Sequence, residues 1–284
     1  MIDRRIRHRT VKAGRIFLHC AELGDPSRPL VLLLHGFPEC WVTWRLQLPA
    51  LAEAGFFAVA PDLRGYGDSS KPPGVRSYRV EELASDVASL IEAYGRSRAV
   101  VVGHDWGAWV GWHLAMWHPT HVERLAVLNV AHPERMRRAL RTVRQLRKSW
   151  YAFFFQLPWL PEWRISRNGF ASVKKLLRFT PARRGAYDEG DVAAIVAALS
   201  KPGALTAALN YYRAAKVLKR RWEVIRAPVL VIWGEQDRWL GSELAEPDPR
   251  WVPDCRVERL PAATHWVQAD EPARVNDLLL RFLR

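Results

Sequence analysis

Five short apolar runs recur along the chain, and each is continuous rather than alternating with polar residues. A continuous apolar run of this length is typical of a strand that is buried on both faces, as in a parallel sheet. The runs are Pro29–Gly36, Phe56–Ala60, Ala99–Val102, Leu125–Leu128 and Val229–Trp233. Weaker patterns predict a further strand at Cys255–Leu260 and a hairpin around Gly14, before Leu23.

Patterns of helical spacing lie between these runs. They cover Thr43–Ala54, Val80–Tyr94, Trp106–Trp117 and Pro272–Phe282. The last of them begins with proline directly after Asp270 and Glu271, which is a favourable helix start. Strands that alternate with helices in this way predict an α/β fold, a mostly parallel, doubly wound sheet with right-handed crossovers.

The alternation stops between residues 131 and 224, where the pattern is helical throughout and broken by prolines. Four apolar residues there, Leu140, Val143, Leu146 and Trp150, are spaced to share one face of a helix. Open α/β sheets bind ligands at the carboxyl ends of their strands. We therefore predict an all-helical cap over that edge, residues 131–224, inserted into a core made of residues 1–130 and 225–284.

The positive charge of the chain is concentrated in the same segment. The formal net charge is +14, and residues 131–224 hold 20 Lys and Arg against 6 Asp and Glu, whereas the remainder holds 23 of each. Basic residues along an amphipathic helix usually form a solvated face, which is the interpretation we favour. Clusters such as Lys219–Arg221 leave an anionic partner, nucleic acid or lipid, as the alternative. No nucleic-acid-binding motif is present, so we expect no nucleic-acid partner.

The remaining composition is that of an ordinary globular protein of 284 residues, with 49% hydrophobic and 25% charged residues. No apolar run reaches the length of a transmembrane span, and no secretory signal follows Met1. The three cysteines, Cys20, Cys40 and Cys255, are scattered and have no metal-ligand spacing. They fit reduced thiols, so we expect a cytoplasmic protein without a metal site.

The most informative local pattern is Gly103-His104-Asp105-Trp106-Gly107, between a predicted strand and a predicted helix. Such a pentapeptide forms the sharp elbow that lifts a nucleophile above a sheet, and its glycines permit the tight turn. Serine at the centre would predict acyl transfer. Aspartate predicts instead that an ionised carboxylate attacks a saturated carbon and leaves an ester on the enzyme.

Other chain segments supply partners for Asp105. His265 precedes the last helix and is the candidate base, and Asp237 follows a strong strand and is the candidate acid, with Glu235 as its rival. The order nucleophile, acid, histidine is that of the α/β-hydrolase triad. The backbone N–H groups of Phe37 and Trp106 are the expected oxyanion-hole donors. The start of a helix at Trp106 places positive potential beside Asp105, which favours its ionised form.

These motifs together resemble an α/β-hydrolase-fold epoxide hydrolase of the soluble type with a helical cap. The resemblance rests on His35–Glu39 (HGFPE), Gly65–Ser70 (GYGDSS), Gly103–Ala108 (GHDWGA) and the segments around Asp237 and His265. It implies a cofactor-independent enzyme that takes a small-molecule epoxide and water and releases a vicinal diol. It also implies that the Phe37–Pro38 bond is cis.

In that family two cap tyrosines hold the epoxide oxygen. The matching positions are Tyr151, before a Phe-Gln-Leu-Pro stretch, and Tyr212, with Tyr211 as its rival. A phenol of pKa about 10 can donate a proton or a hydrogen bond to the developing alkoxide. The expected pocket walls are His35, Pro38, Trp41, Phe153, Phe154 and Trp266. His35 and His104 are also expected to hold loops by hydrogen bonds, and Asp62 and Asp68 to fix turns.

Two other functions fit parts of the pattern. A haloalkane-type dehalogenase uses the same scaffold, and Trp106 beside the nucleophile suits a halide donor. Against it, Phe37 stands where many such enzymes place Asn or an acidic residue. Fluoroacetate dehalogenases carry arginines after the nucleophile, where this chain has Trp106 and Trp109. A catalytically silent binding protein is the third hypothesis, and the complete set of five catalytic side chains disfavours it.

Overall fold

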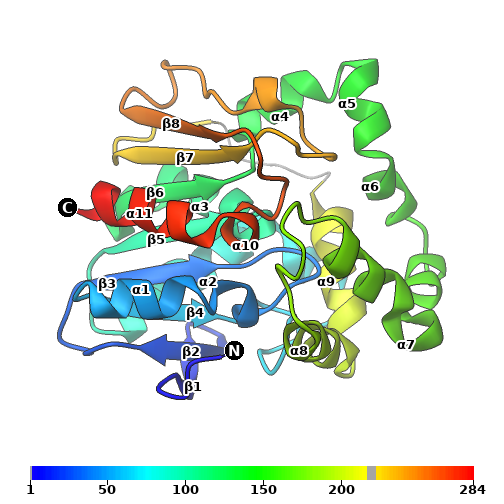
Figure 1. The fold of residues 1–284 in the computed structure, drawn as a ribbon, viewed down its shortest axis with the longest axis horizontal. Coiled ribbons are helices and arrows are strands. Elements are labelled where there is room, and N and C mark those ends of the chain that lie inside the picture. Colours follow the sequence, from blue (N-terminus) through cyan, green and yellow to red (C-terminus); the bar gives the residue numbers. More distant parts are fainter. Residues whose placement is uncertain (1, 216–221) are drawn as a thin grey trace.

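Eight strands form one sheet in the computed structural model, which describes residues 2–215 and 222–284 (Figure 1). Their order across the sheet is β1-β2-β4-β3-β5-β6-β7-β8. The β1–β2 and β2–β4 pairs are antiparallel and the remaining pairs are parallel. The strands are β1 Arg7–Ala13, β2 Ile16–Leu23, β3 Leu30–Leu34, β4 Phe57–Pro61, β5 Ala99–His104, β6 Val122–Leu128, β7 Val229–Gly234 and β8 Cys255–Leu260.

Every strand predicted from the apolar runs is present, as are the N-terminal hairpin and the weaker strand at Cys255–Leu260. Helices cover both faces of the sheet, with α2 (Val80–Ala93) and α3 (Trp106–Trp117) on one face and α1 (Gln47–Glu53) and α11 (Pro272–Leu283) on the other. The doubly wound α/β prediction is therefore confirmed. The first predicted helix is shorter than expected, because Trp41–Trp44 form a 3₁₀ turn before α1 begins.

Between β6 and β7 the described residues form six helices, and Figure 1 shows them beyond the carboxyl ends of the parallel strands. We call them the helical insertion. It comprises α4 Pro133–Ala139, α5 Val143–Lys148, α6 Trp150–Phe154, α7 Leu160–Phe179, α8 Glu189–Ser200 and α9 Ala204–Ala214. Within α7 the backbone leaves helical geometry at Arg167–Phe170. The basic cluster Lys219–Arg221 lies outside the described residues.

The single amphipathic helix predicted through Leu140, Val143, Leu146 and Trp150 is wrong. The chain ends α4 at Ala139 and starts again with α5, because the Thr142 hydroxyl accepts a hydrogen bond from the Gln145 N–H and caps a new helix. A further break at Ser149 separates α5 from α6. All four apolar side chains are exposed rather than packed on the core.

Within the described residues, the structure has no single helix that is both long and apolar enough to cross a membrane. Helices α8 and α9 reach the length and apolar composition of a membrane span only when they are taken together, and the chain bends by 79° between them.

Candidate active site

Asp105 stands in the turn between β5 and α3, with an unfavourable backbone conformation of φ 49° and ψ −121°. The flanking glycines make that turn possible. A Cβ on Gly103 would lie 2.5 Å from the Gly107 carbonyl oxygen, and one on Gly107 would lie 2.0 Å from the Leu34 carbonyl oxygen. Tight packing of β3, β5 and α3 therefore holds the carboxylate at the end of the sheet.

The loop after β3 touches the same carboxylate. The Phe37 N–H donates a hydrogen bond of 2.7 Å to Asp105 Oδ1. The Phe37–Pro38 bond is cis, as the resemblance implied. Trp106 is the first residue of α3, so its backbone N–H is one of those that the helix itself leaves without a partner. One oxygen of Asp105 is thus held by a donor, and the other, Oδ2, faces His265.

The loops after β7 and β8 bring His265 and Asp237 to Asp105. His265 Nδ1 lies 2.7 Å from Asp237 Oδ2, and His265 Nε2 lies 3.5 Å from Asp105 Oδ2. Both His265 and Asp237 are buried. The predicted rival acid, Glu235, points elsewhere and pairs with Arg259 at 3.2 Å. The three predicted side chains therefore lie together, in the order expected of a triad.

Asp237 is held by more donors than His265 alone. Its Oδ1 accepts hydrogen bonds from the backbone N–H groups of Trp239 and Leu240, and its Oδ2 accepts one of 2.9 Å from the Asn129 side chain. Burial opposes ionisation of Asp237, but its interactions with His265 and these donors bring its pKa below the ordinary value. Asp237 is accordingly a stable anion beside the imidazole.

Asn129 is a residue of this site that sequence reasoning missed. It follows β6 with φ 49°, and its amide exchanges two hydrogen bonds with the backbone of Gly234 at the end of β7. Asn tolerates this left-handed conformation better than most residues. Asn129 thus ties the ends of β6 and β7 together and aims Asp237 at His265, with no local motif to signal it.

Two carboxylates control the protonation of His265. Burial would lower the pKa of this histidine, but Asp237 and Asp105 outweigh burial and raise it to about 10. His265 is therefore a positively charged imidazolium, protonated on both ring nitrogens, while both neighbouring carboxylates are ionised. Any event that neutralises Asp105 would lower the pKa of His265 and free Nε2 to act as a base.

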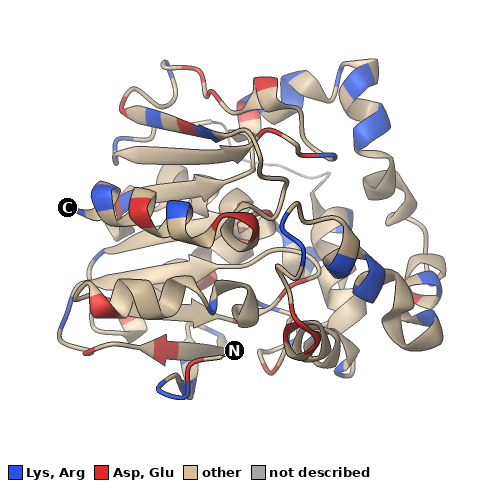
Figure 2. Cartoon of the chain, viewed as in Figure 1, with Lys and Arg blue, Asp and Glu red and all other residues tan. Residues whose placement is uncertain are grey.

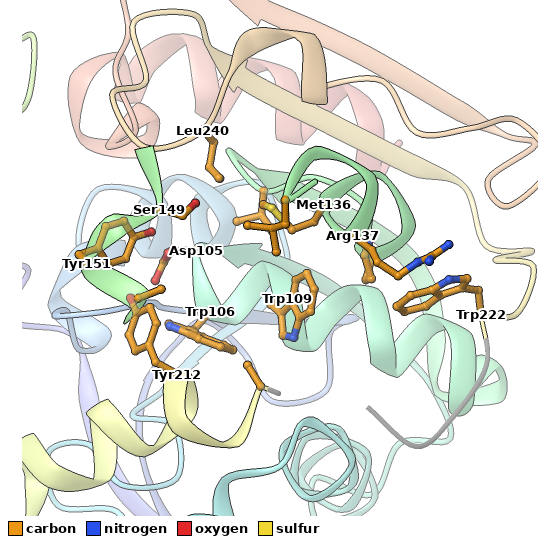
Figure 3. Close-up of a pocket in the computed structure, with 15 residues that line it drawn as sticks. Asp105, Trp106, Trp109, Met136, Arg137, Ser149, Tyr151, Tyr212, Trp222 and Leu240 are labelled. Carbon is orange, nitrogen blue, oxygen red and sulfur yellow. The ribbon is translucent and has the colours of Figure 1, made fainter. Parts of the chain in front are cut away.

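Tyr151 of α6 and Tyr212 of α9 face Asp105 from the helical insertion, as Figure 3 shows. Their ring centroids are 6.0 Å apart. Burial, followed by the negative charge of Asp105, raises the pKa of both phenols, so both remain protonated donors. The rival Tyr211 is turned away, and its hydroxyl donates to the Arg64 carbonyl.

Two cavities meet at Asp105, Tyr151 and Tyr212, which line both of them. The first has a volume of about 340 Å³ and the second about 300 Å³. Most of the lining is apolar. Beyond the shared residues, the first is lined by side chains that include Trp106, Trp109, Met136, Leu140 and Trp222, and the second by Pro38, Phe154, Leu176, Trp239 and Trp266. The site can therefore hold a largely apolar molecule on either side of the carboxylate.

Three of the six predicted wall residues line neither cavity. His35 is fully buried and accepts a hydrogen bond from the Leu63 N–H, so it holds the loop instead. Trp41 packs against His8 at the N-terminal hairpin. Phe153 points outward from α6 and is 58% exposed. Pro38, Phe154 and Trp266 do line the second cavity.

A buried polar network lies behind the histidine. His104 Nε2 is 2.8 Å from the His265 carbonyl oxygen, and His104 Nδ1 is 2.9 Å from Glu39. Glu39 also accepts hydrogen bonds from Thr43 and from Tyr187, which lies between α7 and α8 of the helical insertion. Burial would raise the pKa of Glu39, but the interaction with His104 and these donors lowers it to about 2. The network connects the His265 loop to the insertion.

Asp62 and Asp68 were expected to fix turns, but the contacts of their carboxylates reach distant segments of the chain. Asp62 accepts a hydrogen bond from the Trp41 N–H and one from the His19 ring, and Asp68 pairs with Lys201. Among residues 2–215 and 222–284, no group of three or more His, Cys, Asp or Glu side chains is arranged to hold a metal ion.

Known proteins of similar sequence and structure have the same fold. The model of the alpha/beta hydrolase fold matches residues 29–272. The chain is 38% identical to AB hydrolase superfamily protein YfhM of Bacillus subtilis (strain 168), over 96% of each protein. It is 37% identical to human Epoxide hydrolase 4, over 96% of this chain and 77% of that protein. The crystal structure of an epoxide hydrolase of Bacillus megaterium in complex with an inhibitor superimposes with a TM-score of 0.90 at 33% identity, covering 97% of this chain and 99% of that one.

Proposed function

Because this chain belongs to the epoxide hydrolases of the α/β-hydrolase fold, we propose that it converts epoxides to vicinal diols through a covalent ester on Asp105. One observation carries the proposal. A carboxylate at the elbow faces two protonated tyrosines across the cavities and His265 Nε2 at 3.5 Å. The groups around Asp105 thus include a nucleophile, an acid for an oxygen leaving group and a base for ester hydrolysis.

In the first step, Asp105 Oδ2 attacks an epoxide carbon. Its other oxygen, Oδ1, accepts the hydrogen bond of the Phe37 N–H, so Oδ2, which lies 3.5 Å from His265 Nε2, is the attacking oxygen. The carbon–oxygen bond of the strained ring breaks, and its electron pair moves to the oxygen. Tyr151 and Tyr212 donate hydrogen bonds to that oxygen, and one of them supplies the proton. That tyrosinate then regains a proton at the expense of the His265 imidazolium, so His265 is neutral when the second step begins. The product is a hydroxyalkyl ester whose carbonyl oxygen is Oδ1.

In the second step, a water molecule attacks the Asp105 carbonyl carbon, and His265 Nε2 takes its proton. The oxyanion forms on Oδ1, where Phe37 already donates and the Trp106 N–H is the second expected donor. The bond to Oδ2 then breaks, the departing alkoxide takes the remaining proton of the attacking water, and the diol leaves with Oδ2. Asp105 regains its carboxylate with one oxygen atom from water.

The charges of the site suit this order of events. Ester formation removes the negative charge of Asp105, which is one of the two charges that raise the pKa of His265. His265 therefore becomes a better base when the ester needs hydrolysis. Asp237 keeps its charge through both steps and stabilises the imidazolium.

The helical insertion serves as a cap, for which we propose residues 131–224. It brings both tyrosines to the nucleophile and closes the two cavities over it. Because the cavities extend to either side of Asp105, substituents on both epoxide carbons have room. We assign no metal or organic cofactor to the reaction.

Intact-protein mass spectrometry tests the proposal. A His265→Gln variant mixed with styrene oxide should gain the mass of one substrate molecule, because alkylation proceeds and hydrolysis does not. The same substitution combined with Asp105→Asn should gain nothing. An adduct that survives in the double variant, or halide release from haloalkanes by an enzyme that yields no diol from epoxides, would contradict it.

A further inference from the structure

One segment of the helical insertion exposes a run of large apolar side chains. Residues 140–163, which we call the aromatic edge, contain eight of the 12 exposed large hydrophobic residues in the described part of the chain. Trp159 is 72% exposed, Trp150 64%, Phe153 58% and Trp163 52%. In Figure 1, α5, α6 and α7 run along the side of the molecule farthest from the sheet. Apolar groups of this size on one segment mark an interaction surface.

Basic residues surround the aromatic edge. Residues 133–179 hold 12 Lys and Arg against 2 Asp and Glu, and Figure 2 shows blue segments along α5 and α7. Arg141, Arg147 and Arg164 are exposed. The sequence favours a solvated face for these basic residues. Such a face would carry polar side chains between its Lys and Arg residues. Here tryptophan and phenylalanine stand between them.

We propose that the aromatic edge docks on the surface of an anionic phospholipid bilayer. Tryptophan and phenylalanine insert at the level of the headgroups, and arginine is attracted to anionic lipid. A second copy of this chain is a poor occupant, because it would bring the same positive charge to the contact. Nucleic acid is a poor occupant as well, because the leucines and the valine of the edge offer no stacking surface for bases.

The edge is continuous with both cavities. Leu140 and Arg137 line the first cavity, and Trp150 lines the second. All three are exposed, so each cavity reaches the surface at or beside the aromatic edge. Docking would place these openings against the lipid. Given the proposed function, epoxides dissolved in the bilayer would reach Asp105 without passing through water.

Flotation with lipid vesicles tests the docking. The whole protein should bind phosphatidylcholine vesicles that contain phosphatidylglycerol, should bind pure phosphatidylcholine at least about ten-fold more weakly, and should be released by high salt. A variant with Phe153→Ser, Trp159→Ser and Trp163→Ser should lose at least ten-fold in affinity, as should one with Arg141→Gln, Arg147→Gln and Arg164→Gln.

The control variant carries one aromatic and three basic substitutions on the surface of the α/β core, away from the aromatic edge. It combines Phe17→Ser with Lys12→Gln, Arg15→Gln and Arg76→Gln. Phe17 is 51% exposed and the three basic residues are exposed, so the control should bind like the wild type. Unchanged hydrolysis of a short, water-soluble epoxide verifies that each variant is folded. Vesicle binding is measured without turnover. A protein that does not bind vesicles can therefore be distinguished from one that does not hydrolyse epoxides. No binding at low salt, binding that survives both edge variants, or a lipid-free dimer abolished by the aromatic substitutions would overturn the proposal.

Discussion

Removing the charge of Asp105 should lower the pKa of His265. Asp105→Asn keeps the shape of the side chain and imitates the charge of the ester, which is neutral. In the wild type, Asp237 and Asp105 together raise the pKa of His265 to about 10. The substitution leaves the Asp237 contact of 2.7 Å in place and removes only the charge 3.5 Å from Nε2.

Coulomb's law gives the size of the effect. Two unit charges 3.5 Å apart interact with about 1 kcal/mol in bulk water and about 5 kcal/mol at an effective dielectric constant of about 20. Each pKa unit corresponds to about 1.4 kcal/mol. The pKa of His265 should therefore fall by about one to three and a half units, toward the neutral range in which a histidine base is effective.

Nuclear magnetic resonance titration of the histidine side chains measures this fall. The His265 resonances are assigned by their loss in His265→Gln, and the control is Glu235→Gln. That variant removes a carboxylate from the same loop, but one that pairs with Arg259 rather than His265. A His265 pKa that is equal in Asp105→Asn and the wild type would refute the electrostatic coupling between the two steps.

Four further substitutions probe the site. Tyr151→Phe and Tyr212→Phe should each slow alkylation of Asp105 in stopped-flow measurements by roughly 10²–10³-fold, because each removes a donor to the alkoxide; unchanged rates in the double variant would exclude their role. Asn129→Ala removes three buried hydrogen bonds, so urea unfolding should show a loss of about 3 kcal/mol, and ester hydrolysis should slow more than alkylation. Gly107→Ala places a Cβ 2.0 Å from a backbone oxygen and should cost about 3 kcal/mol or more; wild-type stability would contradict the packing described at the elbow.

The core of the fold was predictable because its strands are buried on both faces. Runs such as Val229–Trp233 are apolar without interruption, and the glycines around Asp105 mark a turn that few other residues allow. The helix predicted roughly over Trp106–Trp117 is also present, as α3. Asp237 and His265 were predicted because each follows a predicted strand, whereas Tyr151 and Tyr212 were predicted from the resemblance to the epoxide hydrolases.

The helical insertion was harder to predict, because periodicity does not say which face of a helix meets the protein. Leu140, Val143, Leu146 and Trp150 have helical spacing, yet the cap at Thr142 divides them and all four side chains are exposed. Phe153 was expected in the pocket and lies on the surface. Asn129 had no local signal, because its partner Gly234 is 105 residues away and only the packed sheet brings them together.

Oxygen-isotope labelling in a single turnover tests the central claim most directly. With enzyme in excess over an epoxide in ¹⁸O-water, the first-formed diol should contain no heavy oxygen, because its new oxygen comes from Asp105 Oδ2. The peptide that contains Asp105 should gain one ¹⁸O atom instead. Heavy oxygen in the first-formed diol, with none in that peptide, would mean that water attacks the epoxide directly and that Asp105 is not the nucleophile.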